Sequence, residues 1–98
     1  MKEIVWTEIA ESDLDAILHY LERRWTQRVM DRFKSKLRDK IDHIHQNPKQ
    51  FPYLNKKRRF RKCVVTKHNT IIYKEFEMHI VLLRIFDTRQ NPNKRIYE

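Results

Sequence analysis

The 98-residue sequence contains no glycine, one cysteine and three prolines. Without glycine it cannot form the glycine-rich loops that cradle phosphates or bind dinucleotides. A single cysteine, Cys63, excludes an internal disulfide and is typical of a reducing cytoplasm. One cysteine and five histidines, none of them paired at i, i+4, also argue against a zinc site, so we expect no metal and no cofactor.

Long apolar runs are also missing. No segment matches a signal peptide or is apolar enough to cross a bilayer, so we expect a cytoplasmic protein without a membrane partner. The length fits a single domain over residues 1–98.

Basic residues outnumber acidic ones by 22 to 13, and the formal net charge is +9. The excess is local, because nine lysines and arginines and no acid lie between Asp42 and Glu75. Such a local positive field is typical of a protein that binds a polyanion, either nucleic acid or an acidic protein.

The first half of the chain predicts two amphipathic helices. Thr7 is a good N-cap for the first, which runs to about Arg24. Its apolar residues recur at three- and four-residue steps: Ile9, Ala10, Leu14, Ile17, Leu18, Leu21 and Trp25.

The second helix can be capped by Thr26 and is ended by Asn47-Pro48. Its apolar stripe consists of Val29, Phe33, Leu37, Ile41 and Ile44. The very short connection at Trp25-Thr26 predicts an antiparallel hairpin that lays one apolar face on a sheet. We place Tyr20, Trp25 and Phe33 in the core.

The remaining segments predict strands. They are an edge strand over Glu3–Trp6 and a meander of Arg59–Lys67, Thr70–Phe76 and a central strand from Ile80 to Phe86, which we expect to be covered on both faces. Asn69 is expected to take a positive φ in the first turn of the meander, Glu77-Met78 to form the second turn, and residues 49–55 to form a loop. The fold class is therefore α+β, with a helix hairpin packed on a four-stranded antiparallel sheet.

Several short motifs, taken in order, resemble the RelE/ParE superfamily of bacterial type II toxins, a class that includes plasmid stabilisation toxins. The motifs are Trp6–Tyr20, the loop from Asn47 to Pro52, Ile71-Ile72-Tyr73 and Arg84–Pro92. The resemblance covers essentially the whole chain. It implies a growth-arresting toxin encoded beside an antitoxin, with a four-stranded antiparallel sheet against two helices. One branch of the superfamily cuts mRNA in the ribosome, and the other poisons DNA gyrase.

The mRNA-cleaving branch implies a metal-independent nuclease site. By position, Arg89 matches its arginine after the last strand, and Tyr97 matches its C-terminal tyrosine. Metal-free RNA cleavage needs cations near the phosphate and groups that transfer protons. The catalytic candidates are Arg61, Lys62, Arg84, Arg89 and Tyr97, with His79 as an alternative to Lys62 in proton transfer. Arg84 interrupts an apolar strand, and the alternative to catalysis is an ion pair with Asp87 or Glu75.

Two further basic segments are candidate binding surfaces. The candidate nucleic-acid contacts are Lys56, Lys57, Arg58 and Arg59, for which the alternative is a solvated edge that discourages strand pairing between molecules. The candidate contacts to an acidic antitoxin are Arg28, Arg32, Lys36 and Lys40, at four-residue steps along the second helix.

The sequence leaves three functions open. They are mRNA cleavage on the ribosome, which is the working interpretation, inhibition of DNA gyrase, and a non-toxic basic nucleic-acid-binding module. Thr70 stands where mRNA-cleaving members commonly carry an arginine, and the ending Thr88–Pro92 looks more like the ParE-like side. The oligomeric state also stays open.

Overall fold

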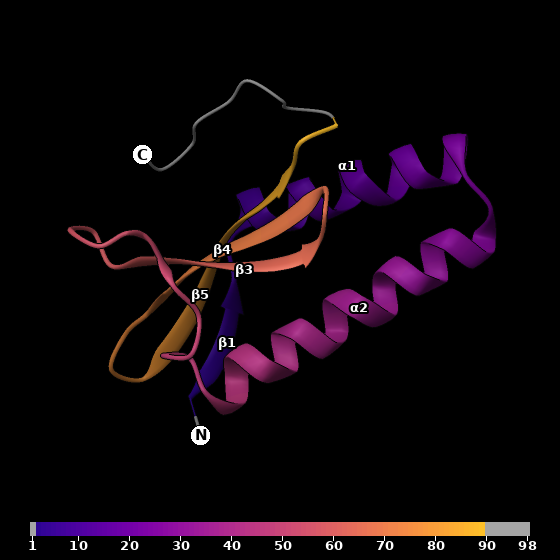
Figure 1. Ribbon diagram of the computed structural model, residues 1–98. Helices are drawn as coiled ribbons and strands as arrows, with labels where there is room; N and C mark the ends of the chain where they lie inside the picture. The colour runs from indigo at the N-terminus through magenta and orange to yellow at the C-terminus, as the bar shows by residue number, and fades with distance from the viewer. Residues whose placement is uncertain (1, 90–98) are drawn as a thin grey trace.

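The computed structural model describes residues 2–89 and shows two helices packed against one face of a five-stranded sheet (Figure 1). The elements, in chain order, are β1 (Glu3–Trp6), α1 (Glu8–Arg24), α2 (Gln27–Gln46), β2 (Tyr53–Asn55), β3 (Phe60–Thr66), β4 (Asn69–Glu75) and β5 (His79–Asp87). The strand order across the sheet is β1-β5-β4-β3-β2. Neither helix in this described part of the chain is long and apolar enough to span a membrane.

Both predicted helices are confirmed, and so are their caps. The Thr7 hydroxyl accepts a hydrogen bond from the Ala10 amide, and the Thr26 hydroxyl accepts one from the Val29 amide. Each cap satisfies an amide that has no partner inside its own helix. The two helices pack on the sheet as the predicted hairpin (Figure 1).

The sheet differs from the predicted four-stranded antiparallel one. It has five strands and is mixed, because β1 pairs in parallel with β5 while the other pairs are antiparallel. The additional strand, β2, lies in the segment that was expected to be a loop. A three-residue strand has no periodicity to detect, and the direction of β1 depends on a partner at the far end of the sequence.

The expected positive φ at Asn69 is also wrong. Lys67 and His68 form the turn, and Asn69 is the first residue of β4, paired with Thr66 and Asp87 on its two sides. A residue in this ladder needs extended backbone. Among the described residues the positive φ belongs to Arg59, at 61°.

The core lies between the helices and one face of the sheet. Its largest fully buried side chains include Ile17 and Leu21 of α1, Ile44 of α2, and Tyr73 of β4. Phe33 is buried and Tyr20 packs against the core as expected, but Trp25 is 53% exposed because it is the C-cap at which α1 ends. The helices cover one face of β5, as the helix hairpin predicted. On its other face Val81, Leu83 and Phe86 are half-buried, so the described residues do not bury that face as fully as the expected cover on both faces would.

One edge of β5 pairs with β1 over the first part of the strand and contacts α1 over the rest. Beyond Leu82 there is no β1 residue to pair with, and α1 takes its place. The Asp13 carboxylate of α1 accepts a hydrogen bond of 2.9 Å from the Ile85 amide and forms an ion pair with Arg84 at 2.7 and 2.9 Å. The partner of Arg84 is therefore Asp13, and not the expected Asp87 or Glu75.

We expect Asp13→Ala to lower the free energy of unfolding by about 2 to 3 kcal/mol. The substitution removes the carboxylate from Arg84, whose side chain is only 20% exposed, and the acceptor from the Ile85 amide. Urea denaturation measures the change. Asp15→Ala is the matched control, because Asp15 is an exposed carboxylate on the same helix and should cost less than about 0.5 kcal/mol. Equal losses in the two variants would contradict the role given to Asp13.

Candidate functional site

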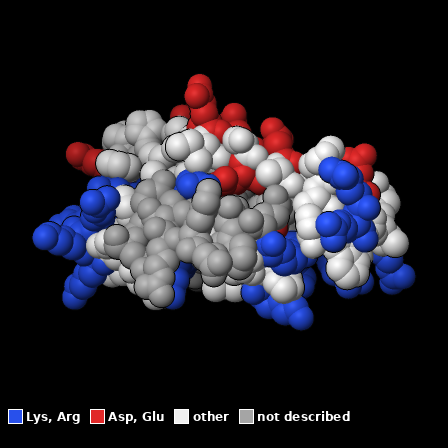
Figure 2. Space-filling view, turned by 90° about the horizontal axis from the view of Figure 1, so that it is seen from above, with Lys and Arg blue, Asp and Glu red and all other residues white. Residues whose placement is uncertain are grey.

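Basic side chains line two pockets at opposite ends of β4, one beside Glu75 and the other beside Asn69. Figure 2 shows that the acidic side chains gather along one border of the molecule, away from most of the lysines and arginines. On this face of the molecule the acidic side chains are therefore largely separated from the basic ones. We call the two sites the Glu75 pocket and the Asn69 pocket.

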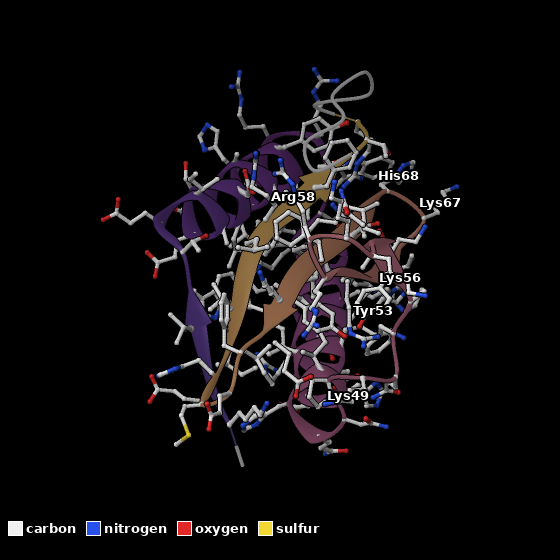
Figure 3. The ribbon with its side chains drawn as sticks, turned by 90° about the vertical axis from the view of Figure 1, so that its left-hand side faces the viewer. Lys49, Tyr53, Lys56, Arg58, Lys67 and His68 are labelled. Atoms are coloured by element: carbon white, nitrogen blue, oxygen red, sulfur yellow. The ribbon has the colours of Figure 1, made fainter. Side chains whose placement is uncertain are left out.

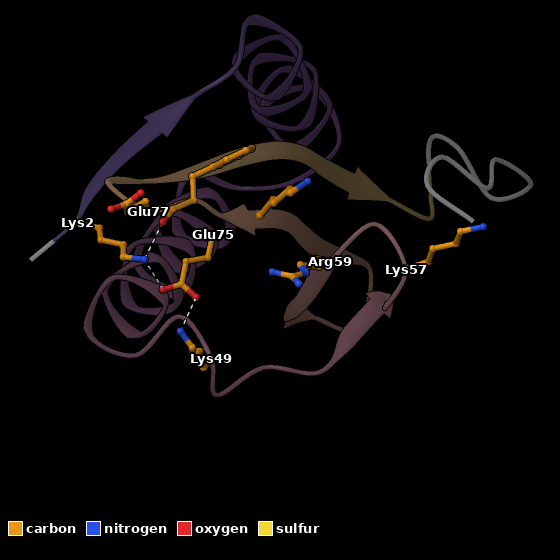
Figure 4. Close-up of a pocket in the computed structure, with 8 residues that line it drawn as sticks. Lys2, Lys49, Lys57, Arg59, Glu75 and Glu77 are labelled. Atoms are coloured by element: carbon orange, nitrogen blue, oxygen red, sulfur yellow. Dashed lines mark hydrogen bonds and ion pairs between the residues drawn. The ribbon is translucent and has the colours of Figure 1, made fainter.

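The Glu75 pocket has a volume of about 570 Å³ (Figure 4). Its lining residues are Lys2, Lys49, Lys57, Arg59, Lys74, Glu75, Phe76 and Glu77. They come from five parts of the chain: the N-terminus, the loop after α2, the β2–β3 turn, the end of β4 and the β4–β5 turn. Five cations therefore face two carboxylates, so the pocket is suited to an anionic ligand.

Glu75 organises the floor of this pocket. Its carboxylate accepts hydrogen bonds from Lys2 at 2.7 Å and from Lys49 at 3.2 Å, as the dashed lines in Figure 4 show. Burial alone would raise the pKa of Glu75, but the two lysines outweigh it and hold the pKa below its ordinary value. The same contacts tie the N-terminal strand and the loop after α2 to the end of β4.

Arg59 enters the pocket from a strained turn. Its φ of 61° lies in the left-handed region, which costs a non-glycine residue roughly 1 to 2 kcal/mol. Hydrogen bonds from the Arg59 amide to the Lys56 carbonyl and from the Arg58 amide to the Asn55 side chain hold the turn. Strained residues of this kind concentrate at functional sites, and here the turn places a guanidinium in the Glu75 pocket (Figure 4).

The candidate nucleic-acid contacts are divided by this turn. Lys57 and Arg59 line the Glu75 pocket, whereas Lys56 and Arg58 are exposed outside it. In Figure 3, Lys49, Tyr53, Lys56 and Lys67 follow one another along the β2–β3 side of the sheet. The basic segment is therefore continuous with the edge strand, and both of the uses expected from the sequence remain open to it.

Arg61, a catalytic candidate, fixes the loop before β2. Its guanidinium donates to the carbonyls of Phe51 and Lys49 at 2.6 and 3.2 Å and to the Tyr53 hydroxyl at 2.9 Å. It also lies over the Tyr53 ring, 4.0 Å from the centroid. The next residue, Lys62, is exposed and points to the other side of the strand. These contacts engage the Arg61 donors within the protein.

Arg89 is also engaged. Its guanidinium pairs with Asp87, at 3.2 Å from Nε to Oδ1, and lies 5.1 Å from the centroid of the Tyr20 ring. Its side chain is 21% exposed, so the exposed arginine expected at the strand exit is in fact half-buried. Tyr97 lies outside the described residues. Of the other catalytic candidates, Arg61 is directed to the loop before β2, Arg84 to Asp13 of α1, and Arg89 to Asp87 and the Tyr20 ring of α1. Lys62 is exposed and lies apart from all three.

The Asn69 pocket has a volume of about 430 Å³. Its lining residues are Leu21, Val29, Arg32, Phe33, Lys36, Thr66, Lys67, His68, Asn69 and Arg89. Two of the four candidate antitoxin contacts, Arg32 and Lys36, line it, whereas Arg28 and Lys40 do not. The sequence could show the charged ridge of α2 but not that the β3–β4 turn closes it into a pocket.

The described part of the chain contains neither a cluster of metal-ligating side chains nor an exposed thiol. No group of three or more metal-ligating side chains is found among residues 2–89. Cys63 is fully buried, and burial raises the pKa of its thiol to about 11, against a smaller opposing effect from Lys40. It therefore acts as a packing residue and not as a nucleophile.

Comparison with known proteins gives two findings. The family model for the ParE toxin of the type II toxin-antitoxin system, parDE, matches residues 4–92. No curated protein sequence matches the chain.

Solved structures share the fold at low sequence identity. A chain of the chromosomal ParDE system from P. aeruginosa has a TM-score of 0.75 and 18% identity, over 89% of this chain and 96% of that one. A chain of the E. coli DinJ-YafQ complex has a TM-score of 0.63 and 13% identity, over 92% and 97%. The YoeB/ParE toxin from Agrobacterium tumefaciens has a TM-score of 0.61 and 15% identity, over 87% and 96%.

The ion pairs of Glu75 predict a dependence of stability on pH. Because the pKa of Glu75 is lowered in the folded protein, its contribution is present above the ordinary value of 4.5 and is lost as the pH falls through the folded pKa. Glu75→Gln should therefore cost about 1 kcal/mol of unfolding free energy at pH 7, and the difference between the two proteins should shrink as the pH falls below 4.5. Urea denaturation from pH 3 to pH 7 measures the difference.

The matched control for this prediction is Glu77→Gln, which makes the same change of charge in the same pocket but outside the Glu75 ion pairs. Its unfolding free energy should stay within about 0.5 kcal/mol of the unaltered protein. A gap between Glu75→Gln and the unaltered chain that is constant across this pH range would show that the lysines do not stabilise the carboxylate.

Proposed function

The chain belongs to the ParE toxin family of type II toxin-antitoxin systems, and from this premise we propose that it arrests growth by binding DNA gyrase, with neutralisation by a cognate acidic antitoxin. The resemblance of the sequence ending to the ParE-like branch points the same way. Chromosomal ParDE and DinJ-YafQ, two of the structures that share the fold, are toxin-antitoxin systems.

One observation carries the choice of a binding mode over mRNA cleavage. Arg61, Arg84 and Arg89, three of the candidate catalytic cations, all make hydrogen bonds within the protein, to carbonyls, a hydroxyl and two carboxylates. Catalysis by charge stabilisation needs donors that are preorganised toward the developing charge. Donors directed at Asp13 and Asp87 would have to leave these carboxylates before they could stabilise a phosphorane.

The Glu75 pocket gives independent support for binding to a complex that contains DNA. Its five cations surround an open hollow and include Lys57 and Arg59 from the strained β2–β3 turn. A basic surface of this kind can contact the phosphates of DNA in a protein-DNA complex. We infer that the Glu75 pocket and the neighbouring β2–β3 turn contact the gyrase-DNA complex.

The positive charge of this chain favours an acidic antitoxin. A net charge of +9 favours fast association with an acidic partner, because complementary fields accelerate encounter. The ridge of α2 offers Arg28, Arg32 and Lys36 on an exposed face. An acidic segment that folds on binding fits this surface.

We expect induction of the chain alone to arrest growth, and the purified chain to inhibit DNA supercoiling by gyrase and to accumulate cleaved DNA while transcripts stay whole. Lys57→Gln combined with Arg59→Asn should raise the inhibitory concentration about tenfold, because two phosphate contacts are lost. Asparagine is chosen at position 59 because it tolerates the positive φ there.

Lys34→Gln combined with Arg38→Gln is the matched control, because it removes the same charge from exposed positions of α2 outside the Glu75 pocket. Transcripts cut at defined sites together with unaffected supercoiling would instead establish the mRNA-cleaving activity. If expression of the chain does not slow growth, the proposed toxin function is wrong, and the chain acts as a non-toxic basic nucleic-acid-binding module.

A further inference from the structure

We propose that the Asn69 pocket binds a carboxylate side chain of the antitoxin, together with an apolar side chain from the same segment. This inference rests on the proposed toxin-antitoxin function, which it deepens by assigning a chemical class of ligand to one pocket. Four observations on the described residues support it: a buried donor without an acceptor, the charge of the lining, its apolar floor, and the division of the α2 ridge.

The first observation is the side chain of Asn69, which is only 1% exposed. Its Oδ1 accepts a hydrogen bond of 2.7 Å from the Thr66 hydroxyl. Its Nδ2 is the one buried side-chain nitrogen or oxygen in the described part of the chain that has no hydrogen-bond partner. Leaving such a donor unsatisfied costs about 1 to 3 kcal/mol, so an acceptor supplied by a ligand would recover this energy.

The second observation is the charge of the lining. Arg32 and Lys36 approach from α2, Lys67 lies in the β3–β4 turn, and Arg89 follows β5. No acidic side chain is among the residues that line the pocket, although one of its cations, Arg89, is paired with Asp87. The remaining cations and the Asn69 amide are all donors, so the ligand group that complements them is an anionic acceptor.

The third observation distinguishes a protein ligand from a nucleic acid. Leu21, Val29 and Phe33 contribute an apolar floor beneath the cations. A phosphate backbone has no apolar group to place on this floor, whereas a glutamate or aspartate beside a leucine or valine satisfies both parts of the pocket. The chemistry therefore favours an acidic and apolar segment of a protein.

The fourth observation is that the basic residues along α2 do not all reach the pocket, although the sequence predicted one continuous ridge. Arg32 and Lys36 line the pocket, while Arg28 lies one turn earlier on the same helix and does not. All three contribute to the long-range field that attracts an acidic partner. Only Arg32 and Lys36 can contact a carboxylate inside the pocket, so their effect on binding should exceed that of Arg28.

The test follows the side-chain amide of Asn69 by NMR in the ¹⁵N-labelled full-length chain. The probe is a capped dipeptide of leucine and glutamate, and the matched ligand is the same dipeptide with glutamine. We expect saturable shifts of the Asn69 amide with a dissociation constant on the order of 1 mM, and binding at least about tenfold weaker for the glutamine dipeptide. Inorganic phosphate and a short single-stranded oligonucleotide are the competing ligands.

Variants locate the binding. Asn69→Asp keeps the Oδ1 that accepts from Thr66 but removes the unsatisfied donor, so it should abolish binding, followed through the backbone amides of residues 66–69. Arg32→Gln should weaken binding about tenfold, whereas Arg28→Gln should change it less than about twofold. If Asn69→Asp does not fold, Arg32→Gln and Arg28→Gln decide alone, because both positions are exposed.

The proposal is overturned if neither dipeptide shifts the Asn69 amide, if phosphate or the oligonucleotide binds there and the glutamate dipeptide does not, or if Arg28→Gln weakens binding as much as Arg32→Gln. Growth arrest by the unaltered chain is scored separately. Carboxylate binding without growth arrest would overturn the proposed function and leave the pocket assigned, whereas growth arrest without carboxylate binding would overturn only the pocket.

Discussion

The Asp13 carboxylate joins the two layers of the protein. It lies at the edge of β5 where β1 ends, and there it accepts a hydrogen bond from a strand amide and pairs with Arg84. This contact fixes α1 against the sheet at a point where no strand can continue the ladder. Because α2 follows α1 after a very short connection, the same contact determines where α2 lies over β3. The Asn69 pocket, formed between α2 and the β3–β4 turn, depends on that placement.

The sequence predicted those parts of the fold that are encoded locally. Each helix carries its own N-cap and apolar stripe, and both were predicted within one or two residues of their observed ends. The direction of β1 and the existence of β2 depend on distant partners, so no local pattern encodes them. We expected the positive φ at Asn69 because asparagine adopts it most readily in a chain without glycine. The strand pairing of Asn69 instead requires extended backbone, and the positive φ occurs at Arg59 in another turn.

Residue types at the candidate site were easier to predict than their partners. An arginine within an apolar strand must be paired, and the sequence shows this for Arg84. Its partner is 71 positions away, and the two acids considered were both nearer in the sequence. Arg61 is a similar case. Its position in the sequence predicts a cation on a strand, but its hydrogen bonds to the loop before β2 can be seen only in the folded chain. The sequence did not predict that the Asn69 amide is buried without an acceptor, because an asparagine just before a strand is typical of a turn.

The distance between the two pockets constrains how an antitoxin can neutralise the protein. β4 has seven residues, with Asn69 at its start and Glu75 at its end, so the pockets are separated by roughly 20 Å at about 3.4 Å per residue. An extended segment needs about seven residues to reach from one pocket to the other, and a helical one about thirteen. A segment of that length covers both pockets and blocks the target surface directly. A shorter segment held only in the Asn69 pocket leaves the Glu75 pocket open, and it must then neutralise the toxin through the bulk of the attached antitoxin.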